Sequence, residues 1–221
     1  MDSKVPSEDE VSSKLTEAYL RYEKFIIPVF LVTFLSFGFY YVDWHNHLLW
    51  KEGMKFYELD TGIDRAIPFV PWFIWLYLLY YPFCFTPIVL LNNRDTFRRI
   101  AAGFLMEFVL AFIVFLTFPV KMIRPEVTAS SLSTKAVALL YSIDPGFNVF
   151  PSLHVANSLF VALIFYRYSK PVGILFMLIA VLISISTLYV KQHYLFDIVT
   201  GALDTLMVYP VVFRGHRPVK A

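Results

Sequence analysis

The chain has 221 residues, of which 58% are hydrophobic and 19% aromatic, and only 16% carry a charge. With a mean hydropathy of +0.62, this composition excludes an ordinary soluble domain and a disordered chain, because both are far more polar. The net charge of +2 is the balance of 19 basic and 17 acidic residues, and the basic ones are scattered in short groups, so nucleic acid is not expected as a partner.

Six apolar runs have about the length that a helix needs to cross the hydrocarbon of a bilayer. They cover residues 25–42, 69–91, 100–118, 152–168, 172–190 and 194–213. The predicted fold class is therefore all-α, a polytopic membrane protein with six transmembrane helices. Pro71, Pro82 and Pro87 interrupt the second run, which predicts a kink or an interfacial opening there. Six crossings place both termini on one side of the membrane.

The stretch before the first run is rich in Asp, Glu, Lys and Ser and lacks the apolar core of a secretory signal. We interpret it as a retained, partly helical tail. Neither an internal repeat nor a Gly/Ser-rich or Pro-rich linker divides the chain. The predicted organisation is a cytoplasmic tail at 1–24, one membrane domain at 25–213 and a cytoplasmic tail at 214–221.

The distribution of lysine and arginine predicts the orientation, because cytoplasmic loops are enriched in both. Twelve of the 19 lie on the side of the tails, at Lys4, Lys14, Arg21, Lys24, Arg94, Arg98, Arg99, Arg167, Lys170, Arg214, Arg217 and Lys220. Seven lie on the other side, at Lys51, Lys55, Arg65, Lys121, Arg124, Lys135 and Lys191. We expect cytoplasmic termini, with the long loops 43–68 and 119–151 periplasmic, lumenal or extracellular. Function is expected on that outer face.

Polar residues that a plain membrane anchor does not need cluster at the outer ends of three predicted helices. They are Lys121, Arg124 and Pro125 after the third run, Ser152 and His154 in the fourth, and Ser186, Lys191, His193 and Asp197 around the start of the sixth. Asp197 follows His193 by four residues, so on a helix its carboxylate can accept the ring N–H and raise the nucleophilicity of the other nitrogen.

The remaining members of this cluster suit a phosphate ligand. Arg124 offers a planar fork for phosphate oxygens. Ser152, with the free N–H groups at the start of a helix, offers further anion donors, and it can also cap that helix. His154 is a candidate general acid that protonates a departing alkoxide. The cluster therefore predicts cleavage of a phosphoester.

At these residues the sequence resembles the type 2 phosphatidic acid phosphatase superfamily, integral-membrane lipid phosphatases related to vanadium haloperoxidases. The family has three motifs: Lys, six residues, Arg-Pro; Pro-Ser-Gly-His; and Ser-Arg, five residues, His, three residues, Asp. The second reads Pro151-Ser152-Leu153-His154 here, and the third reads Ser186-Thr187, five residues, His193, three residues, Asp197. The first remains as Arg124-Pro125.

Two family cations are replaced in this chain. Thr117 stands at the lysine of the first motif and Thr187 at the arginine of the third. Lys121 and Lys191 are the candidates to substitute for them in binding phosphate, although a lysine near a membrane surface can also simply extend to the head groups.

The resemblance implies a mechanism and its residues. His193 attacks the phosphorus and forms a phosphohistidine, with Asp197 as its partner. His154 is the acid for the leaving group, and Arg124 and Ser152 hold equatorial oxygens. No metal or other cofactor is implied. The motif variants Phe-Pro-Ser-Leu-His and His-Tyr-x-x-Asp are most similar to those of the branch of inositol phosphorylceramide synthases, which contains transferases as well as phosphatases.

The predicted function is a membrane lipid phosphatase that hydrolyses a phosphomonoester or pyrophosphate, and its partner is a phosphorylated lipid in the bilayer. The first alternative is a phospho-head-group transferase of the sphingolipid-synthase type. The second is a non-catalytic transporter or scaffold, whose main polar features would be intramembrane charges. The sequence leaves the identity of the lipid and the oligomeric state open.

Other polar residues receive separate interpretations. Glu107 and Asp204 lie at membrane depth, and structural pairing and a role in substrate or proton access both stay open for them. Residues 43–47 include Asp43, His45 and His47 in an aromatic interfacial segment, which does not favour a metal site. The single cysteine, Cys84, is interpreted as a packing residue, and the segment 58–72 as a membrane-surface helix.

Overall fold

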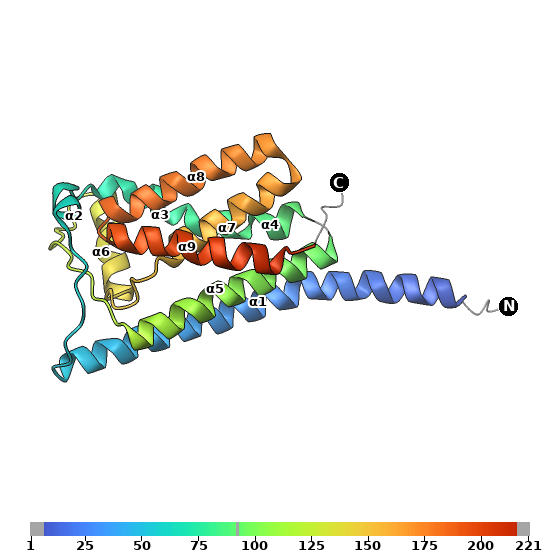
Figure 1. Ribbon diagram of the computed structural model, residues 1–221, viewed down its shortest axis with the longest axis horizontal. Helices are drawn as coiled ribbons and strands as arrows, with labels where there is room; N and C mark the ends of the chain where they lie inside the picture. Colours follow the sequence, from blue (N-terminus) through green and yellow to red (C-terminus); the bar gives the residue numbers. More distant parts are fainter. Residues whose placement is uncertain (1–6, 92, 216–221) are drawn as a thin grey trace.

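The computed structural model describes residues 7–91 and 93–215, and in these ranges the regular structure is helical (Figure 1). The elements are α1 (Glu8–Lys51), α2 (Gly62–Ala66), the 3₁₀ helix η1 (Pro71–Phe73), α3 (Ile74–Leu78), α4 (Tyr80–Leu90), α5 (Arg94–Thr117), α6 (Leu132–Ile143), α7 (Leu153–Tyr168), α8 (Lys170–Tyr189) and α9 (Leu195–Val212). The predicted all-α class is confirmed. The ends of both predicted tails, 1–6 and 216–221, lie outside the described residues.

Five helical stretches in the described part of the chain are long and apolar enough to cross a membrane. They are Ile26–Lys51, Pro71–Leu90, Arg94–Thr117, Lys170–Tyr189 and Leu195–Val212. The remaining predicted run, 152–168, forms α7, whose 16 residues extend about 24 Å, less than the roughly 30 Å of the hydrocarbon. The protein therefore has the character of a multi-pass membrane protein, and the sixth crossing stays a prediction.

The short helix α7 lies at the centre of the bundle. Helices α4, α5, α8 and α9 all pack against it, and Ala156, Phe160 and Ile164 along its length are fully buried. Because neighbours surround it, α7 needs neither a lipid-facing surface nor the full thickness of the membrane. Its first turn, which contains His154, is thereby enclosed by the other helices.

The long helix α1 runs beside α5 and extends past the bundle at its N-terminal end (Figure 1). Ser7 caps it, and it continues without a break through Pro28 to Lys51, so the predicted boundary between tail and membrane domain falls inside one helix. Large apolar side chains such as Phe30 and Phe37 are exposed on it. Such a surface suits contact with lipid chains.

The C-terminal half of α1 holds a long loop in place through buried polar side chains. Asp43 accepts the N–H of Phe147 at 3.1 Å. Asn46 donates to the carbonyl of Phe115 at 3.0 Å, and Asn148 donates to the carbonyl of Phe39 at 2.8 Å. The bonds of Phe147 and Asn148 fix the loop between α6 and α7, which leads directly into the second motif, and the bond to Phe115 joins α1 to α5.

The second predicted run is divided near Pro71 and Pro82, whereas Pro87 lies inside α4 without a break. Pro71 opens η1, and α3 and α4 meet at Leu79. Pro82 lies in the first turn of α4, where a missing N–H costs nothing, because N–H groups there have no partner within the helix. The three pieces together still form the single span Pro71–Leu90.

The long loops gather at the end of the bundle that carries α2 and α6, opposite the start of α1 and the end of α9 (Figure 1). Isolated parallel bridges join Tyr57 to Val120 and Val120 to Asn148, so three loops are tied together. Helix α6 falls in a stretch expected to be loop, and its Val137 packs with Ile74 and Tyr77 in one core cluster. The segment 58–72, interpreted as a surface helix, contains only α2 and the start of η1.

Candidate active site

The segment between α8 and α9 turns tightly and points polar side chains into the bundle. Lys191 has a left-handed backbone with φ +51°, the conformation that commonly ends a helix. The N–H groups of Gln192 and His193 then both donate to the carbonyl of Thr187, at 2.9 and 3.3 Å. Gln192 and His193 are 2% and 5% exposed, so the turn places both inside the protein.

The ring of His193 is oriented by two acceptors at the same nitrogen. Nδ1 lies 2.8 Å from the carbonyl oxygen of Val149 and 3.2 Å from Oδ2 of Asp197. Because a carbonyl accepts and cannot donate, the proton of the neutral ring belongs on Nδ1. Nε2 therefore carries the free lone pair, as a nucleophilic histidine requires.

Asp197 combines two functions at the start of α9. It is fully buried, and its Oδ2 accepts the backbone N–H of Tyr194 at 2.7 Å in addition to facing His193. The carboxylate thus caps the helix on which it lies and holds the ring of His193. The spacing of four residues predicted this pairing, and the structure contains it.

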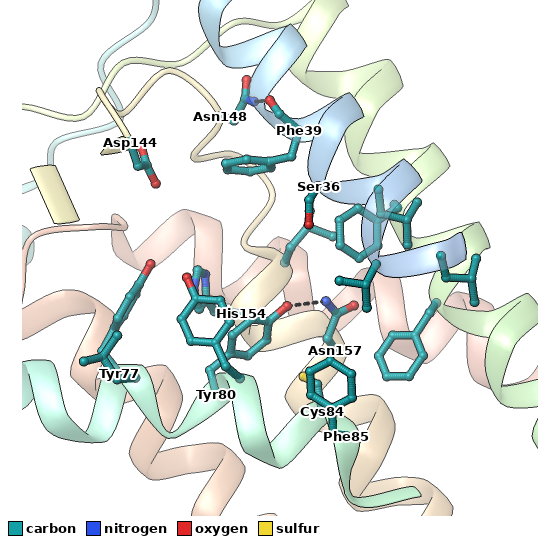
Figure 2. Close-up of a pocket in the computed structure, with 18 of the residues that line it drawn as sticks. Ser36, Phe39, Tyr77, Tyr80, Cys84, Phe85, Asp144, Asn148, His154 and Asn157 are labelled. Atoms are coloured by element: carbon teal, nitrogen blue, oxygen red, sulfur yellow. Dashed lines mark hydrogen bonds between the residues drawn. The ribbon is translucent and has the colours of Figure 1, made fainter. Parts of the chain in front are cut away.

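His154 lies opposite His193, with 5.6 Å between the two ring centroids. Its ring packs against Tyr77 and Tyr80, at centroid distances of 4.5 and 4.3 Å (Figure 2). Its Nε2 is buried and has no hydrogen-bond partner among the described residues. The two aromatic rings hold the imidazole in place while leaving that nitrogen free for a ligand.

Ser152 is a fully buried cap of α7. Its hydroxyl accepts the N–H of Val155 at 3.4 Å, and its own N–H donates to the backbone carbonyl of Asp197 at 3.1 Å. Gly201 makes this approach possible, since a Cβ there would lie 2.4 Å from the carbonyl oxygen of Ser152. The structure therefore places Ser152 between the two motifs as a capping residue, and its contact with phosphate stays a prediction.

Arg124 is partly buried and already engaged in hydrogen bonds. Its guanidinium donates to the carbonyl and carboxylate of Asp144 and to Oε1 of Gln192, and it stacks over the ring of Tyr141. Gly146 gives it room, because this residue has φ +84° and an added Cβ would lie 2.9 Å from Cζ of Arg124. Arg124 thus reaches the neighbourhood of His193 through Gln192.

The two candidate replacement lysines point elsewhere. The ammonium of Lys121 lies 3.7 Å from the centroid of the Trp50 ring. That of Lys191 donates to the carbonyls of Asp64 and Ile67, at 2.9 and 2.6 Å, and burial lowers its pKa against the opposing effect of Asp64. The structure does not bring either ammonium to the histidine pair, so their phosphate-binding roles stay predictions.

A cavity of about 420 Å³ begins at the histidine pair, a volume in the usual range of ligand sites. Its polar lining includes His154, His193, Gln192, Asp144 and Asn148, and Figure 2 shows Asp144 and Asn148 toward the loop side. From there it passes between α1, α4 and α5, where its walls are apolar, with Leu35, Phe85, Ile88, Phe97 and Phe104. One cavity therefore joins the polar site to apolar surface at membrane depth.

Several residues of the site were missed by the sequence analysis. The carbonyl of Val149 carries no side-chain signal and could not have been found. Tyr77 and Tyr80 lie in an apolar run, where aromatic residues are ordinary. Gln192 had a usable signal, because it is the only glutamine of the chain and directly precedes His193. Asp144 begins an Asp-Pro-Gly sequence, which by itself predicts only a loop.

The two charged residues singled out at membrane depth, Glu107 and Asp204, lie outside this cavity. Glu107 accepts from the hydroxyl of Thr205 at 2.7 Å, and Asp204 is 3% exposed; neither lines the cavity. Cys84 does form part of its wall. Within residues 7–91 and 93–215, no three His, Cys, Asp or Glu side chains come together as a metal site.

Comparison with known proteins places these motifs in a family. Residues 57–211 match the family model described as the PAP2 superfamily. An uncharacterized protein of Methanocaldococcus jannaschii is 41% identical over 59 residues, which cover 27% of this chain and 24% of that protein. The chain thus matches about a quarter of the length of this relative. No solved structure gave a significant match.

Proposed function

This chain belongs to the PAP2 superfamily, membership of which implies phosphatase or phosphotransferase activity, and we propose that it is a membrane lipid phosphatase. It hydrolyses a lipid phosphomonoester or pyrophosphate through a phosphohistidine at His193. The observation that supports this proposal best is the pairing of His193, with its free Nε2, and His154 at the head of the apolar cavity.

The first step transfers the phosphoryl group to the enzyme. Nε2 of His193 attacks the phosphorus, and the N–P bond forms as the P–O bond to the lipid alcohol breaks. His154 gives a proton to the departing oxygen, so the alcohol leaves neutral. The carboxylate of Asp197 and the carbonyl of Val149 face the Nδ1–H and stabilise the ring as it becomes cationic.

The second step returns the enzyme to its starting state. Water attacks the phosphohistidine, and His154, now neutral, accepts its proton. The new P–O bond forms as the N–P bond breaks, which releases inorganic phosphate. The same histidine thus acts as acid in the first step and as base in the second.

The apolar part of the cavity supports a lipid as the substrate. A hydrocarbon chain can lie between α1, α4 and α5, beside Leu35, Phe85 and Phe97, while its phosphate reaches the histidine pair. Burying the chain there adds favourable contacts that a short water-soluble phosphoester lacks. We propose that the site opens on the non-cytoplasmic face, with six crossings and both termini in the cytoplasm.

We expect the topology to appear in cysteine labelling. In a Cys84→Ala background, a cysteine at exposed Ser130, near α6, should react with an impermeant reagent in intact cells. A cysteine at Asn93, between α4 and α5, should react only after the membrane is opened. Labelling at 93 alone in intact cells would show that the orientation is inverted.

A panel of lipids tests the reaction. We expect the purified protein to release inorganic phosphate from at least one of diacylglycerol phosphate, phosphatidylglycerol phosphate, a polyprenyl pyrophosphate or a phosphorylated sphingolipid precursor. Excess chelator should leave the rate unchanged, because no step uses a metal. A matched short-chain phosphoester should react with a lower kcat/KM if the apolar cavity binds the chain.

Head-group transfer is the second candidate, and one observation favours it. Among the described residues that line the cavity there is no lysine or arginine, so the lining suits a phosphodiester, which carries one negative charge, better than a dianionic monoester. Incubation with a labelled phosphodiester lipid plus ceramide or diacylglycerol separates the two functions. Formation of a new head-group lipid, without release of phosphate from any monoester, would show that the protein is a transferase and not a hydrolase.

A further inference from the structure

Gln192 is a buried polar residue that the mechanism above does not use. It is the only glutamine of the chain, it precedes His193, and it is 2% exposed. Its side chain lines the cavity together with His193 and His154. A side-chain amide buried beside a candidate nucleophile needs a hydrogen-bonding explanation.

Arg124 fixes which way this amide points. A guanidinium has only donors, so the atom of Gln192 that faces Arg124 must be the acceptor Oε1. The amide nitrogen Nε2 is then directed away from Arg124. This nitrogen is buried and has no hydrogen-bond partner in the described part of the chain, which leaves two N–H donors available to a ligand.

Asp144 holds Arg124 in position. The carboxylate of Asp144 lies 3.3 Å from the guanidinium, and the two side chains are 16% and 9% exposed. Arg124 itself is absent from the described residues that line the cavity. The arginine therefore sets the position of the glutamine, and the glutamine presents its donors at the site.

We propose that Gln192 is a substrate-binding residue whose Nε2 donates to a non-bridging oxygen of the phosphoryl group attacked by His193, and that Arg124 is its positioning residue. This inference rests on the proposed function. A preorganised donor at that oxygen stabilises the charge that develops during transfer. Gln192 supplies this contact in a chain where Thr187 stands at the position of the arginine of the third motif. Thr187 carries no charge, is fully buried, and donates its hydroxyl to the carbonyl of Ser184.

The test separates donation to phosphate from support of Arg124. Gln192→Glu keeps an acceptor for Arg124 and removes the N–H donors, whereas Gln192→Met removes both. We expect both variants to lose kcat/KM by roughly 10²- to 10³-fold, as for removal of one donor to a developing oxyanion. Asn93→Asp is the matched control, since it makes the same amide-to-carboxylate change at the cap of α5, and it should stay at the wild-type value.

Binding of orthovanadate, a mimic of the phosphoryl group in transfer, gives a second readout that needs no turnover. In thermal unfolding of the detergent-purified chain, orthovanadate should raise the Tm of the wild type and of Asn93→Asp but not of either Gln192 variant. Wild-type binding and turnover in Gln192→Glu would mean that the residue only holds Arg124, and would overturn the inference. A wild type that binds orthovanadate yet cleaves no lipid would refute the proposed function alone.

Discussion

Replacing His193 should remove nearly all turnover. In His193→Ala no nitrogen remains to form the bond to phosphorus, and we expect kcat to fall by a factor on the order of 10⁶, as when the nucleophile of a hydrolase is deleted. His193→Asn is a sharper variant, because its amide can still donate to the carbonyl of Val149 while Nε2 is lost. It should be equally inactive and unfold close to the wild-type Tm.

The covalent intermediate gives the corresponding direct measurement. Brief incubation with a ³²P-labelled substrate, followed by denaturation, should leave acid-labile label on the wild type and none on His193→Asn. His45→Ala is the control, since His45 lies on α1 and is not part of the cavity; it should retain the label and the activity. Wild-type turnover in either His193 variant would contradict the phosphohistidine mechanism.

Loss of His154 should produce the second-largest effect, and one that depends on the leaving group. In His154→Ala a lipid alcohol has to depart as an unprotonated alkoxide, so we expect kcat to fall by roughly 10² to 10⁴. The effect should be much smaller with p-nitrophenyl phosphate, because nitrophenolate leaves without a proton. The quantity to measure is the ratio of the wild-type kcat to the His154→Ala kcat, determined once with the lipid and once with p-nitrophenyl phosphate.

Tyr80→Phe is the control for this experiment. It keeps the ring that packs against His154 and removes only the hydroxyl that accepts from Asn157 at 2.6 Å. Its activity should stay within a few-fold of the wild type for both substrates. An equal loss for the lipid and the nitrophenyl ester in His154→Ala would assign this histidine to binding rather than to proton transfer.

The helical architecture followed closely from the sequence, because the bilayer restricts spanning segments to long apolar helices. Apolar length placed five candidate spans, and the prolines located the division of the second one. The sequence did not reveal that the run at 152–168 becomes a short central helix. Burial by neighbours is a property of the packed bundle, and apolar composition is the same for a residue in lipid and a residue in a core.

Within the site, local spacing determined what depends on one stretch of backbone. His193 and Asp197 are four residues apart, Ser152 precedes α7, and Arg124-Pro125 follows α5, so each was found from residue type and order. The first two of these relations are local, because the start of a helix sets them over a few residues. They hold in any tertiary arrangement that forms the same local structure.

The tertiary structure alone decided which partners these groups have. His193 faces the carbonyl of Val149, 44 residues away in sequence, and Arg124 is engaged by Asp144 and Gln192. The ammonium groups of Lys121 and Lys191 lie on an aromatic ring and on two carbonyls. A long flexible cation binds whichever acceptors the fold brings near it, so a residue's type limits its chemistry, but its neighbours in space select its role.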